Sequence, residues 1–382
     1  DLAITYLERA ISLDPDNAIA HFNMGSALQD QGDQKAAIKS YKNAIKIKPD
    51  YAEAYSNLGN AQRDIGDLDA AIKSFKKALI LDPNCAEIHN NIGNTLDNKG
   101  DYGAAVTSYE KAIKINPNFA EIYYNKGVSL RNHGKVAQAT EAFQKALDIK
   151  PDYAKALNNI GICLKDQGKL DEAMKAYKKA LNANPAYAAA LNNLGVCLKH
   201  HGRLNEATEA CKKALLFEPN FAEAHNNLGM ILNEQGKLDE AIGAYKKSLN
   251  IKPKFKEAYN NMGLSLGRLG KSEEALESYR AALAINPNYN TAKVNLAGQI
   301  SKMGDLQAAI KMLREILKKD PTDQATISAL IYIIVLSDKF SSAQILLEAR
   351  SYVKALEIPF ITKRPNFSNS RDPDRCLQIG FV

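Results

Sequence analysis

One asparagine recurs every 34 residues along most of this 382-residue chain, and its side chain is well suited to recognition. The recurring positions are Asn23, Asn57, Asn91, Asn125, Asn159, Asn193, Asn227, Asn261 and Asn295. A carboxamide offers both donors and an acceptor, so a row of carboxamides can pair with the N–H and C=O groups of an extended polypeptide. Each such bond contributes about 0.5–1.5 kcal/mol net, so useful affinity requires several in a row. We predict that this row, here called the asparagine ladder, binds a protein or peptide partner in extended conformation.

A structural role for the same residues is the alternative hypothesis. A second asparagine often precedes the ladder residue, at Asn90, Asn158, Asn192, Asn226 and Asn260. Each ladder amide could instead hydrogen-bond a neighbouring unit and fix how the units stack. Asparagine is a poor helix former and gains nothing from apolar burial, so its regular recurrence requires one of these explanations. We favour peptide binding and keep stacking as the alternative.

The elements that carry the ladder follow the same period. Ten prolines recur at Pro15, Pro49, Pro83, Pro117, Pro151, Pro185, Pro219, Pro253, Pro287 and Pro321. A self-similar unit of 20 to 50 residues is the signature of a solenoid. In the unit 222–255, apolar residues at helical spacing predict two helices, one around Leu228 and one around Tyr245. Gly236 lies between them and predicts a left-handed helix end that turns the chain into an antiparallel helix.

Small and aromatic residues at fixed places in the unit predict the packing of the two helices. Glycine in the middle of the first helix, as at Gly25, costs about 1 kcal/mol relative to alanine, so a close helix crossing must offset it. Ala37 and its equivalents play the same part on the second helix. We expect bulky rings to fill the core at Tyr41, Phe75, Tyr109, Phe143, Tyr177, Tyr245 and Tyr279. We also expect the residue after the proline to N-cap the next first helix, at Asp50, Asn84, Asn118, Asp152, Asn220 and Asn288.

The period also divides the chain. A partial unit, consisting of a second helix only, occupies 1–17 and precedes nine complete units at 18–323. A degenerate helix pair at 324–357 has an unusually apolar first helix, which either is covered by another domain or closes the array as a cap. Residues 358–375 read as a linker, and 376–382 as the first strand of a following domain that is missing here. We therefore expect the chain to be part of a longer protein.

These motifs resemble the tetratricopeptide repeat. The resemblance rests on the small residue in the first helix, the glycine turn, the alanine and aromatic residue of the second helix, and the terminal proline. It covers about 306 of the 382 residues. The resemblance implies an all-α, right-handed superhelical solenoid of antiparallel helix pairs, with the first helices lining a concave groove. Such a face can also pair two chains, and the sequence does not indicate whether a homodimer forms.

Composition and charge bear on the remaining partners. The formal net charge is +7, but lysines such as Lys76 and Lys178 recur where helices should face water, so we expect a solvated outer face and no nucleic-acid partner. The longest apolar run, 327–336, is too short to span a membrane, and we expect no membrane partner. Cys163 and Cys197 occupy equivalent places in adjacent units, roughly 8–10 Å apart, too far for a disulfide. Reduced thiols predict a cytoplasmic protein.

No catalytic or metal-binding constellation is present in the sequence. His200 and His201 point to different sides of a helix, so we expect no metal site and assign no catalytic residue. Repeats that clamp a carboxylate tail of a chaperone place Lys or Arg on the groove face, where this chain has residues such as Ser56. Arg63 and Arg131 are candidate groove cations, which we expect to stay solvated.

The C-terminal residues carry a second resemblance. Arg371-Asp-Pro-Asp-Arg375, followed by Cys-Leu-Gln-Ile-Gly-Phe-Val, resembles the junction that leads into the catalytic region of O-linked N-acetylglucosamine transferases and plant O-fucosyltransferases. That family also has an asparagine ladder that holds acceptor polypeptides. The resemblance implies a substrate-recruiting array fused to a glycosyltransferase that uses a nucleotide sugar such as UDP-GlcNAc. No cofactor is expected within the present chain. The alternative is a freestanding adaptor without a fused enzyme.

Overall fold

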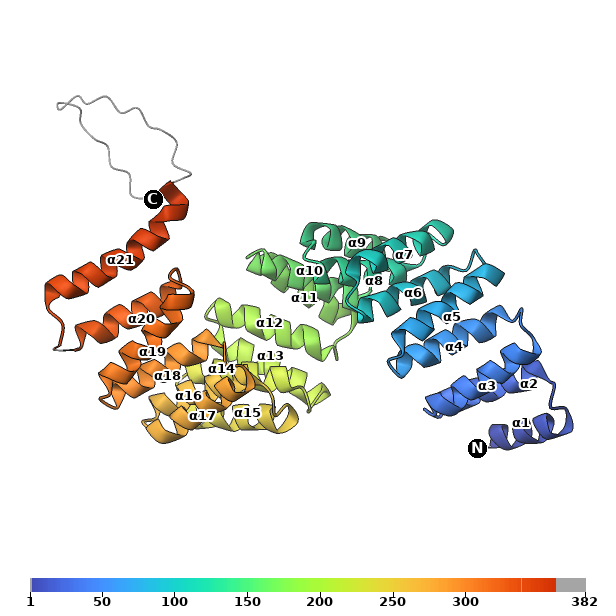
Figure 1. Ribbon diagram of the computed structural model, residues 1–382, viewed down its shortest axis with the longest axis horizontal. Coiled ribbons are helices and arrows are strands. Elements are labelled where there is room, and N and C mark those ends of the chain that lie inside the picture. Colours follow the sequence, from blue (N-terminus) through green and yellow to red (C-terminus); the bar gives the residue numbers. More distant parts are fainter. Residues whose placement is uncertain (1, 338, 362–382) are drawn as a thin grey trace, which may run out of the picture. The chain divides into compact units, whose positions relative to one another are not determined.

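The computed structural model describes residues 2–337 and 339–361, and these residues form α-helices with no strand among them. The chain divides into two compact units, Asp1–Pro219 (unit 1) and Asn220–Val382 (unit 2). Each of the nine predicted repeats contains one first helix and one second helix (Figure 1). The fold class predicted from the sequence, an all-α solenoid of antiparallel helix pairs, is therefore confirmed.

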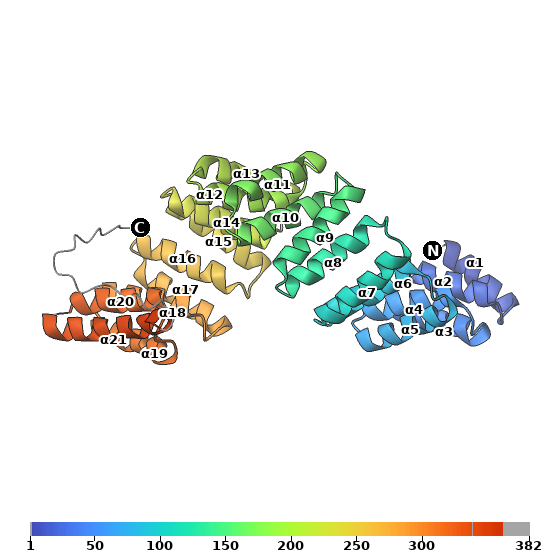
Figure 2. The same cartoon turned by 90° about the horizontal axis from the view of Figure 1, so that it is seen from above.

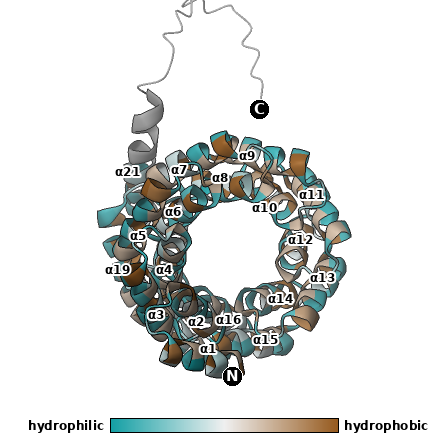
Figure 3. Ribbon diagram, turned by 90° about the vertical axis from the view of Figure 1, so that its right-hand side faces the viewer, coloured by the Kyte–Doolittle hydropathy of each residue, from teal (hydrophilic) through white to brown (hydrophobic). Residues whose placement is uncertain are grey.

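Unit 1 contains thirteen helices in its described part. Its first helices are α2 (Ala18–Asp30), α4 (Ala52–Asp64), α6 (Ala86–Asn98), α8 (Ala120–Asn132), α10 (Ala154–Asp166) and α12 (Ala188–His200). Its second helices are α1 (Leu2–Leu13), α3 (Gln34–Ile47), α5 (Leu68–Leu81), α7 (Tyr102–Ile115), α9 (Val136–Ile149), α11 (Leu170–Ala183) and α13 (Leu204–Phe217). Within this unit, α4, α6, α8, α10 and α12 lie on the inner side of the curve, and α5, α7, α9, α11 and α13 lie on its outer side (Figure 3).

Unit 2 continues the same alternation. Its first helices are α14 (Ala222–Glu234), α16 (Lys256–Arg268), α18 (Asn290–Lys302) and α20 (Gln324–Val335). Its second helices are α15 (Leu238–Ile251), α17 (Ser272–Ile285), α19 (Leu306–Lys319) and α21 (Ser342–Ile361). The C-terminal helices α18 to α21 lie side by side (Figures 1 and 2).

An aromatic ring set against a glycine explains the close packing inside a repeat. Tyr41, on α3, is fully buried, and a Cβ atom added to Gly25, on α2, would lie 2.6 Å from its ring. The same contact recurs in six further repeats. In the repeat of α12 and α13, Cys211 replaces the ring and its Sγ faces Gly195. The close packing of the ring thus offsets the cost of a mid-helix glycine. A residue larger than glycine at this position would clash with the ring.

The glycine turns adopt the predicted left-handed conformation. All nine have positive φ, between 70° for Gly202 and 97° for Gly304. In the first of them, the N–H of Asp33 donates to the carbonyl oxygen of Leu28 at 2.9 Å, which closes the end of α2. A residue with a side chain is disfavoured at this φ, so glycine is required here for backbone reasons.

The predicted N-caps of the first helices were wrong. Asp50 and its equivalents Asn84, Asn118, Asp152, Asn220 and Asn288 each precede the N-cap by one residue. The N-cap is instead a residue such as Tyr51 or Tyr153, with no side-chain capping bond. The proline and the Asp or Asn after it form the turn that ends the previous helix. The aromatic N-cap then packs on a preceding ring, as Tyr51 does on Phe22 with centroids 5.0 Å apart.

The C-terminal helix pair differs from its predicted boundary. The helix α21 ends at Ile361, although proline at position 359 led us to end it at Glu357, so the start of the predicted linker is helical. The rest of that linker, the predicted strand at 376–382, and the junction from Arg371 onward lie outside the described residues.

Candidate functional site

All nine ladder asparagines lie on first helices. Asn23, Asn57, Asn91, Asn125, Asn159 and Asn193 belong to unit 1, on α2 to α12, and Asn227, Asn261 and Asn295 belong to unit 2, on α14 to α18. Of these helices, α4, α6, α8, α10 and α12 lie on the inner side of the curve of unit 1 (Figure 3). Asn23 is exposed, Asn159 is buried, and the other seven are half-buried. Within each unit, the ladder therefore lies on the first helices.

Ladder residues in both units donate a hydrogen bond to the second asparagine of the preceding repeat. The Nδ2 groups of Asn125 and Asn193 donate to the Oδ1 atoms of Asn90 and Asn158, at 3.1 and 3.0 Å. In unit 2, Asn261 and Asn295 donate in the same way to Asn226 and Asn260, at 3.0 and 2.8 Å. All four acceptors are buried. The second asparagine is therefore the stacking residue, a role that its position next to the ladder did not reveal.

The stacking bond leaves part of the ladder amide available. An asparagine amide carries two N–H donors and a carbonyl oxygen with two lone pairs. For Asn125, Asn193 and Asn295, the bond to the preceding repeat is the only side-chain hydrogen bond within the described part of the chain. One donor and the carbonyl oxygen of each therefore remain free of protein partners there. Stacking and peptide binding are compatible for these three residues.

Asn159 differs from these three ladder residues. Its Oδ1 accepts from Arg131 at 2.7 Å, and its Nδ2 donates to the carbonyl oxygen of Lys155 at 2.9 Å. Its Nδ2 also lies 3.5 Å from the hydroxyl of Tyr124. Arg131 is thus engaged by the ladder, contrary to the expectation that it stays solvated. Arg63, the other candidate groove cation, lies 3.6 Å from Asp64.

On α4, α6 and α8, the stripe that carries the ladder residue is uncharged in its centre and begins with an acid. On α8, Glu121, Asn125, Val128 and Asn132 are the partly or fully exposed residues of one helical stripe. Glu53 and Glu87 occupy the place of Glu121 on α4 and α6, and both are exposed. The arrangement can form hydrogen bonds and apolar contacts with a ligand.

Two tyrosines near Asn159 stay protonated at physiological pH. Burial raises the pKa of Tyr124, and the hydrogen bond to Asn159 and the charge of Arg131 only partly oppose this effect. Burial, followed by the charge of Glu121, raises the pKa of Tyr153 to about 12. The two rings contact each other with centroids 5.1 Å apart. These hydroxyls are neutral hydrogen-bonding groups here, which supports a binding surface that contains no phenolate.

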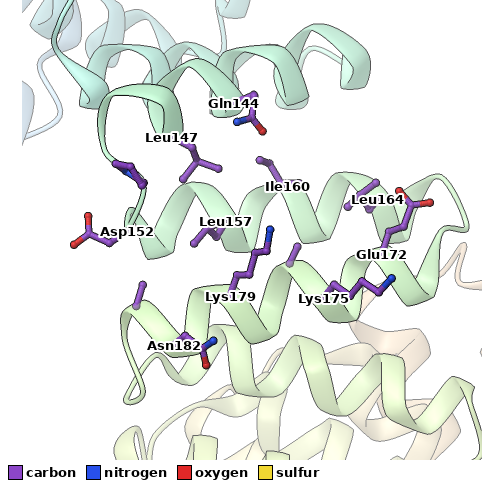
Figure 4. A pocket seen from close by; sticks show the side chains of 13 residues that line it. Gln144, Leu147, Asp152, Leu157, Ile160, Leu164, Glu172, Lys175, Lys179 and Asn182 are labelled. Carbon is purple, nitrogen blue, oxygen red and sulfur yellow. The ribbon is translucent and has the colours of Figure 1, made fainter.

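Unit 1 has a second kind of concave surface, between its outer helices. A groove of about 770 Å³ lies between α9 and α11, and α10 forms its floor. Leu157, Ile160 and Leu164 of α10 line that floor, and Lys175 and Lys179 of α11 stand at the rim (Figure 4). Smaller grooves occur at equivalent places between α5 and α7, α7 and α9, and α11 and α13. The sequence pattern did not predict these grooves.

The side chains of the described residues form neither a metal site nor a membrane span. No group of three or more His, Cys, Asp and Glu side chains there is arranged to hold a metal ion. No helix in the same part of the chain has the length and apolarity needed to cross a membrane. Cys85, Cys163, Cys197 and Cys211 are free thiols.

Comparison with one solved structure, that of Cut9–Hcn1, supports the fold. The structure of the anaphase-promoting complex heterotetramer Cut9–Hcn1 matches with a TM-score of 0.58 and 15% identity, over 83% of this chain and 76% of that one. A crystal structure of MamA is 33% identical over 43% of this chain and 96% of that chain, with a TM-score of 0.40. YrrB, described as a tetratricopeptide protein with an unusual peptide-binding site, is 27% identical over 48% of this chain and 95% of that chain, with a TM-score of 0.39. No curated protein matches the chain.

Comparison with protein families covers most of the repeats. A model of the tetratricopeptide repeat matches residues 257–289. A longer model, described as the cilia and flagella-associated protein 70 C-terminal domain, matches residues 2–260, which is more than half of the chain. The repeats identified from their prolines, glycines and rings are therefore tetratricopeptide repeats, and the chain belongs to the family of the cilia and flagella-associated protein 70 C-terminal domain.

Proposed function

We propose that the first-helix face of this array binds polypeptide segments in extended conformation along the asparagine ladder. The observation that carries this proposal is the unused donor and acceptor on Asn125, Asn193 and Asn295. A peptide unit also presents one donor and one acceptor, so each free amide can pair with the backbone without reading a side chain.

The stacking bonds support binding because they hold the amides in place. A side chain that is already fixed loses little conformational entropy when a ligand arrives, and this raises affinity. The bond from Asn193 to Asn158 fixes the amide in this way at one repeat, and the bond from Asn125 to Asn90 does so at another. We infer that the same ladder residue both stacks neighbouring repeats and binds the peptide.

A photo-crosslinking experiment distinguishes the ladder face from the outer grooves. A randomised pool of twelve-residue peptides is first selected for binding to the protein. A photoreactive phenylalanine analogue is then placed either at Val196, three residues after Asn193, or at Lys179, on the rim of the outer groove. We expect selected peptides to crosslink from position 196 and not from position 179. Crosslinking from position 179 alone would assign binding to the outer groove and contradict the proposal.

We propose further that the array recruits acceptor proteins for a fused nucleotide-sugar glycosyltransferase. This finer proposal is supported by the sequence of the Arg371–Val382 junction together with the ladder. The matched family models describe repeat domains and do not test it. A freestanding adaptor that assembles a protein complex is the alternative.

The full-length protein tests this finer proposal. It is incubated with a cell extract and with radiolabelled UDP-GlcNAc or GDP-fucose, and transfer of the sugar to proteins is measured. We expect transfer that falls when Asn125 and Asn193 are both replaced by alanine. Absence of transfer from both donors would favour the adaptor, and it would leave peptide binding by the ladder intact.

A further inference from the structure

A second column of side chains runs beside the ladder in unit 1. It lies three residues after each ladder asparagine, on the same helix face. The column is polar in the first three repeats, at Ser26, Asn60 and Asn94. It is apolar in the next three, at Val128, Ile162 and Val196, which we call the apolar track. All six side chains are half-buried, so each keeps a surface that a ligand can touch.

The packing of their own repeats explains two of the three polar members of this column. The hydroxyl of Tyr41, on α3, lies 3.2 Å from the Oγ atom of Ser26. The hydroxyl of Tyr109, on α7, donates to the Oδ1 atom of Asn94 at 2.7 Å. Ser26 and Asn94 therefore each serve the tyrosine of their own repeat. Asn60 does not, because the ring of its repeat is Phe75, and the Oδ1 atom of Asn60 has no partner among the described residues. Val128 likewise lies in a repeat whose ring, Phe143, has no hydroxyl.

Ile162 leaves the tyrosine of its own repeat without a partner. The ring of its repeat is Tyr177, which is fully buried, and its hydroxyl has no hydrogen-bond partner among the described residues. A buried hydroxyl without a partner destabilises the fold. A serine or asparagine at position 162 would offer this hydroxyl a partner, as at positions 26 and 94. The isoleucine instead adds an apolar side chain to the face that carries the ladder.

We propose that the apolar track selects the bound peptide by its apolar side chains, which recur at every third residue. This inference rests on the proposed function and adds the chemistry of the ligand. Asn125 and Asn193 have free amide groups for the peptide backbone, whereas the amide of Asn159 between them is already used by Arg131. At this middle repeat, the ligand therefore contacts the side chain of Ile162 instead of a ladder amide.

The three-residue spacing follows from the dimensions of the two chains. The first helices α8, α10 and α12 contact their neighbours in turn, and packed helices lie roughly 8–10 Å apart. Three residues in the polyproline II conformation advance about 9.3 Å, and their side chains point the same way. Two residues of a β-strand advance only about 6.7 Å. A peptide with polyproline II geometry thus presents one apolar side chain to each residue of the track.

Two fluorescein-labelled peptides of identical composition test the spacing. Each has four isoleucines and eight serines, placed with isoleucine at every third position in one peptide and at every second position in the other. We expect the three-spaced peptide to bind about tenfold more tightly, the gain from burying one further apolar side chain. Equal affinities, or preference for the two-spaced peptide, would overturn the inference.

Two substitutions separate ligand selection from packing. Replacing Ile162 with asparagine offers a partner to the Tyr177 hydroxyl, so the melting temperature should stay the same or rise while the three-spaced peptide binds about tenfold more weakly. The ring in the repeat of Val128 is Phe143, which has no hydroxyl to gain a partner. Val128→Asn should therefore weaken binding without raising the melting temperature.

The outcomes also distinguish this inference from the proposed function. If both variants bind the three-spaced peptide as the parent protein does, the apolar track does not select ligands. If that binding still falls when Asn125 and Asn193 are replaced by alanine, the ladder proposal stands on its own. If no peptide, including the randomised pool, binds the parent protein, both proposals fail.

Discussion

At the scale of single residues, one hydrogen bond between asparagines of neighbouring repeats separates stacking from recognition. Asn158 is buried and accepts the stacking bond, whereas Asn193 donates that bond and keeps its other groups free of protein partners in the described region. The sequence predicted the ladder as a set but left its two roles open. The two roles can be told apart only when the acceptor of the stacking bond is known. That bond joins residues 35 positions apart, so the local sequence does not reveal it.

Two glycines of one repeat predict opposite effects of the same substitution. An added Cβ at Gly229 would lie 2.5 Å from the ring of Tyr245, whereas no heavy atom lies within 4 Å of one at Gly243. Gly229→Ala should lower the free energy of unfolding by about 1–3 kcal/mol, because the ring has to move. Gly243→Ala should raise it by about 1 kcal/mol through helix propensity. Urea denaturation measures both, and a change of the same sign in both variants would refute this account of the core.

Burial predicts the order of thiol reactivity. Burial raises the pKa of Cys211 to about 12, so this group remains a neutral thiol at any pH below that value. The thiolate is the nucleophile, so Cys211 should resist a thiol reagent at pH 8 until the protein unfolds. Half-buried Cys85 should react first in a variant with Cys376 replaced by serine. Mass spectrometry of the peptide that contains Cys211 measures its reaction. Rapid reaction of Cys211 in the folded protein would contradict its burial.

At the scale of the helices, caps vary between repeats more than the sequence pattern suggests. The N-cap Asp101 accepts from the N–H of Ala104 at 3.0 Å at the start of α7. At the start of α11 the same position holds Lys169, which makes no capping bond. The first helices were expected to begin with Asp or Asn caps, but those residues belong to the preceding turn. The error arose because one residue of register decides whether a side chain reaches the helix end.

Substitutions at these caps test the corrected register. Asp101→Ala should lower the free energy of unfolding by about 1 kcal/mol, and Lys169→Asp should raise it by about the same amount. Asp152, once expected to cap α10, is the matched control, and Asp152→Ala should change stability by less than about 0.5 kcal/mol. Thermal unfolding followed by circular dichroism compares the three. A loss at Asp152 as large as that at Asp101 would restore the original assignment.

At the scale of the whole molecule, a strict period makes the fold predictable and hides the differences that matter for binding. The prolines, the glycine turns and the rings alone predicted the helix pairs, because local periodicity determines a repeat fold. The outer grooves and the engagement of Asn159 by Arg131 were not predictable in this way. Both depend on which side chains of successive repeats meet, for example Arg131 on α8 and Asn159 on α10.

Matched pairs of alanine substitutions test the central claim, that the ladder binds polypeptides as well as stacking repeats. One variant lacks Asn125 and Asn193, and the other lacks their stacking partners Asn90 and Asn158, so both lose the same two hydrogen bonds. The measurement is the dissociation constant of a selected peptide, by fluorescence anisotropy, beside the melting temperature of each variant. We predict that both melting temperatures fall, whereas affinity falls about tenfold or more only without Asn125 and Asn193. Equal affinities for the two variants would show that the ladder serves stacking alone and would contradict the account.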